Sequence, residues 1–431
     1  MLNDGELIFF LDRCYLSELP INLAFELKSN DLILKGDSQR VSFVGVIFMG
    51  DTVNIFLPRS SILPKDNKQK FHVASNIILA IEKYGRASSK TIIQQKDEGI
   101  GDKNLMKLSL LKNLLIDYSQ NGIYSKRQSV LRRNRGKTNW KMTVNGFNPY
   151  PSQDGQPVYI DSYGVNREYY SECEIAKIHA QVIRKINEKI SWLLMGGQRL
   201  EVWGLRDYRA PNGDIESQIL QLRQEIAKTY SDRDIILLKM LIDFLENLSD
   251  LNQSNFVIGM TKFHFCWEAM LARVLEHVEL VNSRLPFPVY ITKEGTELPA
   301  IDSSMRTDIF MHDRTHKVIA VVDAKYYSAT HANNSPRWKD IVKQLFYEKA
   351  VQTLLIDASI KNIFVFPGSV GNINHLVMKK RDSDSLVIGP FADEFKPIYC
   401  YYADPMEVVK SYIKNKKMAH LSAEILQLDY A

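Results

Sequence analysis

Two aspartates and a lysine stand beside two short apolar runs, and these are the residue types that hydrolysis of a phosphodiester requires. Asp308 comes directly before the first run, and Asp323 closes the second run, two residues before Lys325. Both runs read as strands, and the polar segment 312–317 between them predicts a turn. Antiparallel pairing across this turn places Asp308 roughly opposite Asp323. Lys325 shares a face with Asp323, because side chains alternate along a strand.

Two carboxylates and one ammonium group at the end of a strand pair suit Mg²⁺ or Mn²⁺. Mg²⁺ prefers oxygen ligands, keeps several waters and usually takes only one or two protein carboxylates. The ion can polarise a phosphoryl oxygen and lower the pKa of a bound water. Lys325 would orient that water and offset the charge that develops at phosphorus. The pattern therefore predicts a metal-dependent phosphodiesterase.

Three further side chains on predicted helices are candidates for the same site. Glu268 follows Trp267 at the edge of an apolar helical stripe, where a carboxylate needs a cation or hydrogen bonds. It either serves the site or forms a structural salt bridge. Gln344 and Tyr347 are three residues apart and share one face of the helix after the lysine. They either contact the scissile phosphate or the metal shell, or they cap and pack the helix.

These residues resemble the PD-(D/E)XK nuclease superfamily, in the variant with a Gln-x-x-Tyr helix after the lysine. Thr307 replaces the proline that usually precedes the first aspartate, a common departure that leaves the chemistry intact. More narrowly, the chain resembles the LlaJI family of restriction endonucleases, relatives of McrC, over about residues 40 to 370. The segments that carry this narrower resemblance are Phe43–Ile47, Phe56–Arg59, Asn121–Tyr124, Gly136–Thr143 and Phe265–Leu271.

The resemblance implies a role for each residue of the site. Asp308 and Asp323 would bind the metal, together with the backbone carbonyl of Ala324. Lys325 would position the attacking water. Glu268 would hold the lysine, a metal-bound water or a second ion.

The resemblance also implies a phosphate contact, a fold and a partner. Gln344 and Tyr347 would contact the phosphate, and the domain would have the αβββαβ core of the superfamily. The substrate would be double-stranded DNA, cut as part of an anti-phage restriction system. The nuclease would act beside an McrB-like AAA+ GTPase hexamer.

Length and composition describe an ordinary globular protein. The 431 residues allow two or three domains, and the formal net charge of +5 is too mild for a polycation. No apolar segment reaches transmembrane length, and the first residues do not read as a signal peptide. The four cysteines form no Cys-x-x-Cys pair, and His179 has no second ligand at metal-binding spacing. We therefore expect a cytoplasmic protein with no structural zinc and no membrane association.

Strand and helix patterns predict a multidomain α/β protein in three parts. Residues 1–115 read as a β-rich N-terminal module, which the family resemblance makes a candidate for binding the partner. Residues 116–250 read as a basic loop followed by three helices. Residues 251–431 read as a C-terminal PD-(D/E)XK nuclease domain with the order helix, three strands, helix, strand. The first helix of that domain is predicted over 260–281, and its first strand is predicted over 287–292.

A run between positions 126 and 141 contains seven basic residues and no acidic ones. Its basic residues and one tryptophan form the predicted DNA-binding set: Lys126, Arg127, Arg132, Arg133, Arg135, Lys137, Trp140 and Lys141. Such a run suits a phosphate backbone, an acidic partner surface, or plain solvation. Gly136-Lys137-Thr138 is not a phosphate loop, because position 131 is Leu where the motif needs Gly, and no other match exists. We therefore expect this chain to bind no nucleotide and any motor to be a separate protein.

Taken together, these features favour a Mg²⁺-dependent DNA endonuclease subunit of a restriction system. A reading from a different class is a non-catalytic assembly factor that docks on an AAA+ ring and stimulates nucleotide hydrolysis. The basic run and the β-rich N-terminal module would serve that role. A third reading is a nuclease that acts on RNA or damaged DNA with the same metal chemistry.

Overall fold

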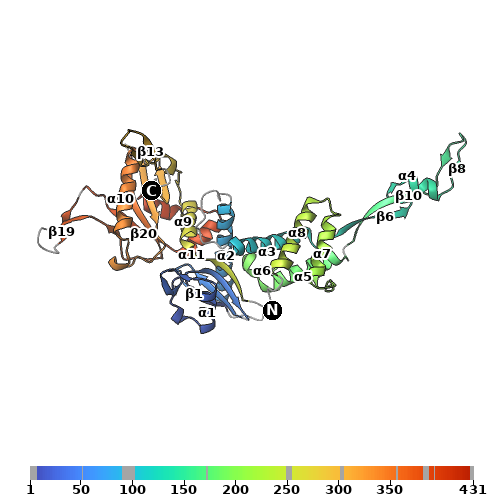
Figure 1. The fold of residues 1–431 in the computed structure, drawn as a ribbon, viewed down its shortest axis with the longest axis horizontal. Coiled ribbons are helices and arrows are strands. Elements are labelled where there is room, and N and C mark those ends of the chain that lie inside the picture. Colours follow the sequence, from blue (N-terminus) through green and yellow to red (C-terminus); the bar gives the residue numbers. More distant parts are fainter. Residues whose placement is uncertain are drawn as a thin grey trace. The chain divides into compact units, whose positions relative to one another are not determined.

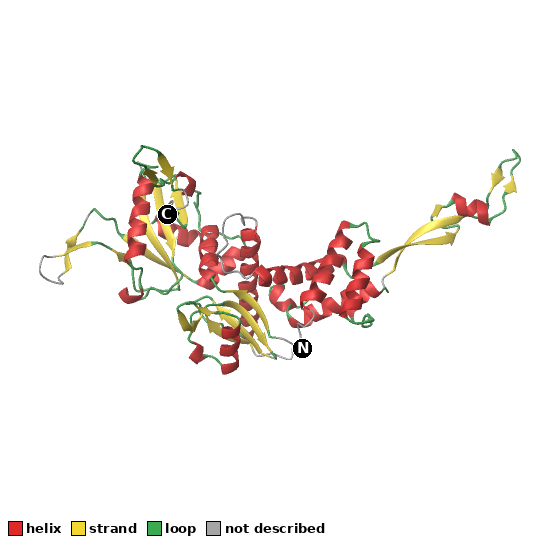
Figure 2. Cartoon of the chain, viewed as in Figure 1, coloured by secondary structure: helices red, strands yellow, loops and turns green. Residues whose placement is uncertain are grey.

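The chain has a mixed α/β architecture that divides into two compact units (Figures 1 and 2). The discontinuous unit combines Met1–Leu108 with Ser254–Ala431, and the inserted unit is Ser109–Gln253. The computed structural model describes residues 7–50, 52–89, 102–170, 173–248, 255–300, 305–355, 358–381, 388–392 and 394–427. The sequence patterns predict the N-terminal module and the nuclease region as separate parts, whereas in the structure most of the two regions forms one compact unit. They join because a strand after residue 254 pairs with the N-terminal sheet.

The N-terminal sheet has the strand order β1-β5-β4-β11. β1 (Leu7–Leu11) runs parallel to β5 (Thr52–Leu57). β4 (Val44–Met49) pairs antiparallel with β5 on one side and with β11 (Phe256–Met260) on the other. Gly259 allows this close pairing, because a Cβ atom there would lie 2.4 Å from the ring of Phe43.

Short elements and one long helix surround this sheet. Their bounds are η1 (Leu16–Glu18), α1 (Ile21–Ser29), β2 (Ile33–Leu34), β3 (Asp37–Val41) and α2 (Asn67–Ser89). Leu23 and Leu27 of α1 are buried in one cluster with Phe43, Ile47 and Phe56. α2 packs on β4, β5 and β11. Strands β1 to β5 thus all precede α2 in the sequence.

The second sheet of the discontinuous unit has the order β14-β15-β16-β20-β17. Its strands are β14 (Ile309–Asp313), β15 (Val318–Ala324), β16 (Ser359–Pro367), β17 (His375–Leu376) and β20 (Ile398–Ala403). β14 is antiparallel to β15, whereas β15, β16 and β20 run parallel. Strands buried on both faces explain the near-continuous apolar runs in this part of the sequence.

Four of the described helices accompany this sheet: α9 (Phe263–Val274), α10 (Trp338–Gln352), α11 (Pro405–Ile413) and α12 (Ala419–Leu426). α12 packs on β15, whereas α11 packs on α2 and α9. α9 packs on β14 and β15, and α10 packs on β15 and β16. Minor elements are η3 (Asn282–Arg284), η5 (Ala332–Asn334), and the paired β18 (Lys379–Arg381) and β19 (Ile388–Phe391).

The helix predicted over 260–281 is shorter than expected. α9 ends at Val274, and His277 adopts a left-handed backbone with φ 55°, which turns the chain. The segment after His277 then runs beside β14, where the N–H of Glu279 donates to the carbonyl of Phe310 at 2.9 Å. An extended segment therefore occupies the edge of the sheet where the sequence predicted continued helix.

The strand predicted over 287–292 exists but does not join the second sheet. It is β12 (Val289–Ile291), which pairs with β13 (Glu297–Pro299) in a separate two-stranded sheet. Gly295, with φ 83°, closes a tight turn that brings β13 back onto β12. The predicted strand is therefore present, but it belongs to a local hairpin and its expected place in the core sheet is wrong.

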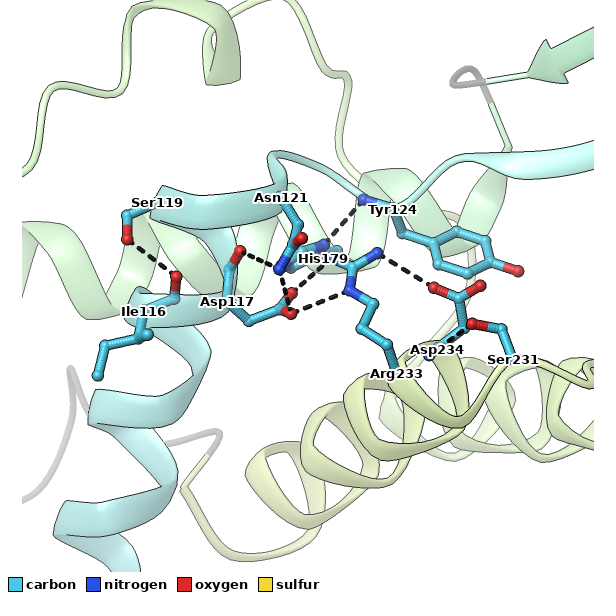
Figure 3. Close-up of polar contacts among 9 residues, drawn as sticks. All are labelled: Ile116, Asp117, Ser119, Asn121, Tyr124, His179, Ser231, Arg233 and Asp234. Carbon is cyan, nitrogen blue, oxygen red and sulfur yellow. Dashed lines mark hydrogen bonds and ion pairs between the residues drawn. The ribbon is translucent and has the colours of Figure 1, made fainter.

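The inserted unit contains the helices that the periodicity predicts. They are α3 (Asp102–Asn121), of which the larger part lies in this unit, α5 (Glu174–Lys189), α6 (Ser191–Leu194), η2 (Trp203–Leu205), α7 (Ile215–Ile226) and α8 (Asp232–Leu248). Ser231 precedes α8, and its hydroxyl accepts a hydrogen bond from the N–H of Asp234 in the first turn at 3.4 Å (Figure 3).

The basic segment of the inserted unit is a strand where the sequence predicted a loop. β6 (Lys126–Arg133) pairs antiparallel with β10 (Tyr163–Tyr170) along its whole length, and β7 (Lys137–Thr138) adds to β10. α4 (Trp140–Gly146), β8 (Tyr150–Pro151) and β9 (Pro157–Val158) lie between them in sequence. Pairing with the Tyr- and Val-containing β10 gives β6 an extended conformation that its own composition does not predict.

His179 is a fully buried residue of α5. Its Nδ1 accepts a hydrogen bond from the backbone N–H of Tyr124 at 3.1 Å, and Arg233 forms an ion pair with Asp117 beside it (Figure 3). Burial lowers the pKa of His179 to about 4, so the ring is neutral. Among the described helices, none combines the length and the apolar character that crossing a membrane requires.

Candidate active site

Asp308 and Asp323 face each other across two paired strands. The register pairs Ile309 with Val322, so the next position places Asp308 opposite Asp323, as the sequence predicts. Asp308 Oδ2 accepts a hydrogen bond from the N–H of Ala324 at 3.1 Å. Asp323 is only 3% exposed. Strand pairing thus fixes two carboxyl groups at one end of the hairpin.

Lys325 points toward the same end and is held by two carboxylates. Its Nζ lies 2.9 Å from Oδ2 of Asp323 and 2.6 Å from Oδ1 of Asp340, which is in the first turn of α10. Burial opposes the charged form of Lys325, but the two carboxylates outweigh it and raise its pKa above the usual range. The lysine is therefore a fixed positive charge.

Two acids of this site are disfavoured in their charged form. Burial, together with the neighbouring Asp323 and Glu268, raises the pKa of Asp308 to about 8. Burial likewise raises the pKa of Glu268 to about 7, with Asp323 as the second cause. Glu268 extends from α9, so helix and hairpin bring three carboxyl groups within electrostatic reach. Perturbed carboxyl pKa values of this kind are typical of functional sites.

Gln344 and Tyr347 are close to the site but are engaged with the backbone. Gln344 is fully buried, and its Nε2 donates to the carbonyl of Val321 on β15 at 2.6 Å. The hydroxyl of buried Tyr347 donates to the carbonyl of Arg306. Both contacts tie α10 to the strands that carry the aspartates, which favours a positioning role. Their contact with a phosphate stays a prediction.

A family model for the LlaJI restriction endonuclease matches residues 43–393. The chain belongs to the LlaJI restriction endonuclease family. The matched range covers most of the chain and includes α9, the β14–β15 hairpin and α10. The resemblance inferred from the sequence is thereby confirmed, and LlaJI membership supports a nuclease role within a restriction system.

One relative of this LlaJI-family chain is the type II restriction enzyme BsuMI component YdjA of Bacillus subtilis (strain 168). It is 27% identical over 438 residues, which cover 95% of this chain and 89% of the relative. A solved chain from a half-complex of Thermococcus gammatolerans McrB AAA+ hexamers with bound McrC is 14% identical with a TM-score of 0.40. That match covers 95% of this chain and 99% of the other. A chain of the Thermococcus gammatolerans McrBC complex is 14% identical with a TM-score of 0.28, covering 61% and 85%.

The donor set of the site fits a divalent cation with few protein ligands. Within the described ranges, no three His, Cys, Asp or Glu side chains are grouped so that they would hold a metal. Mg²⁺, however, usually takes only one or two carboxylates. Oδ2 of Asp323 is buried and lies 2.9 Å from the ammonium group of Lys325. A carboxylate has more than one lone pair on each oxygen, so Asp323 can ligate a cation while it keeps this ion pair.

Two charged residues of α10 were missed by the sequence analysis. Asp340 binds Lys325, and Lys343 has a pKa above its usual value because the nearby Asp323 and Asp308 carboxylates outweigh its burial. Asp340 lies one helical turn before Gln344. The i, i+4 spacing places Asp340 on the same helix face as Gln344, and this spacing could have indicated Asp340 from the sequence.

The predicted DNA-binding residues lie in the inserted unit, and most of them are exposed. We call β6, the turn at 134–136, β7 and α4 the basic arm. Its exposed members are Arg132, Arg133, Arg135, Lys137, Trp140 and Lys141. Lys126 instead pairs with Glu225 at 2.7 Å, and Arg133 pairs with Asp161. The side chain of Arg127 lies outside the described part of the structure.

Proposed function

We propose that this chain is the Mg²⁺- or Mn²⁺-dependent endonuclease subunit of a restriction system that cuts double-stranded DNA. The observation that supports this most directly is the convergence of Asp308 and Asp323 from paired strands, with Lys325 on the same side. A purely structural role accounts poorly for three partly or fully buried carboxyl groups, because burial beside Asp323 raises the pKa values of Asp308 and Glu268 and such an arrangement costs stability. Membership of the LlaJI family supports the same conclusion.

Asp308, Asp323 and the carbonyl of Ala324 would hold the ion. When bound, Mg²⁺ would supply Lewis-acid chemistry, that is, polarisation of a phosphoryl oxygen and acidification of a water. Asp340 and Asp323 keep Lys325 protonated, so the lysine acts as a fixed charge that orients water and stabilises negative charge at phosphorus. Gln344 holds β15 against α10 through the carbonyl of Val321.

Glu268 has a supporting role in this proposal. Burial and the charge of Asp323 raise its pKa to about 7, and it would hold Lys325, a metal-bound water or a second ion. The pKa values of Asp308 and Glu268 would both fall when a cation binds nearby, because a positive charge favours the carboxylate form.

Metal removal tests the proposed activity directly. The purified full-length chain, assayed with its AAA+ partner and GTP, is expected to cut plasmid DNA in Mg²⁺ and to lose all cutting in EDTA. Mg²⁺ or Mn²⁺ added back in excess should restore the rate. A rate that is unchanged in EDTA after prior dialysis against chelator would contradict the proposal.

The AAA+ partner is part of the proposal and rests on the LlaJI and McrC resemblance of the sequence. The chain carries no phosphate-loop motif, so energy for translocation has to come from another protein. The same assay without the partner, or with GTP omitted, separates the two contributions. Full cutting by the chain alone would reject the need for a motor while leaving the nuclease assignment intact.

The basic arm is proposed to bind the phosphate backbone. Replacing Arg135, Lys137 and Lys141 together by Ala should weaken DNA binding at low salt and lower the slope of log affinity against log salt by about 3, since each phosphate contact contributes about 0.9. Fluorescence anisotropy with a labelled duplex measures both quantities. All three side chains are exposed, so folding should be unaffected.

The matched control removes three exposed lysines from α11 and the residues after it: Lys410, Lys414 and Lys416. This control should leave the salt slope within error of the wild type. If both triple variants reduce the slope equally, the effect is net charge alone and the basic arm has no dedicated role in binding.

A further inference from the structure

Tyr326 directly follows the proposed catalytic lysine, and its side chain is buried against the end of the N-terminal sheet. The Tyr326 hydroxyl accepts a hydrogen bond from the backbone N–H of Arg59 at 3.1 Å, and Nη1 of Arg59 donates to the Tyr326 carbonyl at 3.3 Å. The hydroxyls of Ser60 and Ser328 are 2.6 Å apart. Three polar contacts therefore join the segment after β5 to the segment after β15.

Asp12 completes this connection from the end of β1. Its Oδ1 accepts a hydrogen bond from the N–H of Phe43 at 3.1 Å, and its Oδ2 lies 3.6 Å from Nε of Arg13. Burial raises the pKa of Asp12 to about 6, although Arg13, Arg59 and the Tyr326 hydroxyl all act in the opposite direction. A buried carboxyl group that is only partly compensated is costly. The buried carboxyl group of Asp12 therefore indicates a role other than core packing.

The backbone beside this network is also unusual. Arg13 has φ 72° and Ser60 has φ 62°, so two non-glycine residues adopt the left-handed conformation next to Asp12 and Arg59. Such conformations persist where surrounding contacts over-determine them, and they gather at functional sites. The end of the N-terminal sheet that contacts Tyr326 is therefore polar and has a constrained backbone conformation.

The aromatic ring of Tyr326 makes the connection to the acid on α9. It packs against Phe263, with ring centroids 5.4 Å apart, and against Trp267 at 6.3 Å. Trp267 immediately precedes Glu268. Tyr326 directly follows Lys325 in the chain, and its side chain contacts both the segment after β5 and the helix that carries Glu268.

We propose that Tyr326 is a positioning residue, through which the N-terminal sheet sets the places of Lys325 and Glu268 for cleavage. The inference rests on the proposed nuclease function and adds the N-terminal sheet to the machinery of that site. The physical reason is the steep dependence of rate on geometry, since a displacement of about 1 Å costs about 100-fold. Loss of the anchor would let the strand exit and α9 shift relative to Asp323.

The test is Tyr326→Phe in the full-length chain, assayed with Mg²⁺, the partner and GTP, well below the unfolding midpoint. The variant keeps the ring that packs on Trp267 and loses the hydroxyl that binds Arg59. The maximal cleavage rate should fall about 10- to 100-fold, while KM for DNA changes less than twofold. A loss confined to the maximal rate is what misplaced catalytic groups produce, and reduced DNA binding would change KM instead.

Tyr401→Phe is the matched control. It removes a tyrosine hydroxyl of the same unit, on β20, that donates to the carbonyl of Glu424 on α12 at 2.7 Å. This control should cut at the wild-type rate. Equal rates for Tyr326→Phe and wild type, or equal losses for Tyr326→Phe and Tyr401→Phe, would overturn the inference.

A second variant decides the question if Tyr326→Phe does not fold. Ser60→Gly removes the hydroxyl that meets Ser328 and suits the positive φ at this position, so the fold tolerates it. Its maximal rate should fall several-fold at unchanged KM, and a wild-type rate would reject the inference. Asp323→Asn in the same assay tests the proposed nuclease function separately from the role of Tyr326. If Asp323→Asn cuts at the wild-type rate, the proposed function itself is wrong.

Discussion

Replacement of Asp323 by Asn is expected to reduce DNA cleavage by at least about 1,000-fold, which corresponds to about 4 kcal/mol in the activation free energy. The amide keeps the shape of the side chain but lacks the charge that binds the ion and compensates Lys325. Single-turnover cleavage of a labelled duplex in saturating Mg²⁺ measures the effect. Partner binding should stay at the wild-type level, because Asp323 is buried.

The same substitution should not destabilise the fold. Asp323 raises the pKa values of Asp308 and Glu268, so its charge disfavours the ionised form of both neighbours. Asn removes this repulsion, while Lys325 keeps its ion pair with Asp340. We expect an unfolding midpoint equal to or above that of the wild type, as is common where an active site is arranged for function at the expense of stability.

Asp313→Asn is the matched control for this prediction. Asp313 is an equally buried aspartate at the other end of the same hairpin, where it binds His316 and the turn. The control is expected to lose stability and to keep its cleavage rate. The assignment of Asp323 fails if both variants cut DNA equally well.

Replacement of Lys325 by Met should abolish cleavage and also destabilise the chain. Met retains most of the apolar stem but leaves Asp323 and Asp340 without their shared cation. Breaking a buried ion pair on one side costs about 3–5 kcal/mol, and the partial exposure of Asp340 places this case at the lower end. Urea unfolding measures the stability change, and the single-turnover assay measures the rate.

The double variant Lys325→Met/Asp340→Asn separates the two effects. Removing the charge of Asp340 should restore part of the lost stability, because one of the two uncompensated carboxylates is gone. Cleavage should stay absent, because no positive charge remains at the position of the lysine. Recovery of cutting along with stability would mean that Lys325 serves the fold alone.

The hairpin of the site could be predicted from sequence because the determining interactions are local. Near-continuous apolar runs on both sides of a short polar turn predict two paired strands, and the turn sets a register that places Asp308 opposite Asp323. The helices of the inserted unit were predictable for the same reason, since their apolar spacing is read within one segment. Family resemblance supplied the connection to Glu268.

Contacts between distant segments were not predictable in this way. Arg59 meets Tyr326 across more than 260 positions of the sequence, and no local pattern of either residue indicates the other. The strand β11 joins β4 by the same kind of long-range pairing. β6 is extended because β10 pairs with it, although its basic composition alone predicted a loop.

The long-range pairing of β11 has a consequence for synthesis on the ribosome. β4 is translated about 200 residues before β11, so one side of β4 stays unpaired while the whole inserted unit emerges. An open strand edge on a nascent polypeptide invites pairing with other chains. The four-stranded sheet can be completed only after residue 260 has left the exit tunnel. The polar end of that sheet, which anchors Tyr326, is completed at the same time. Translation order therefore delays assembly of the cutting centre until the inserted unit has been made.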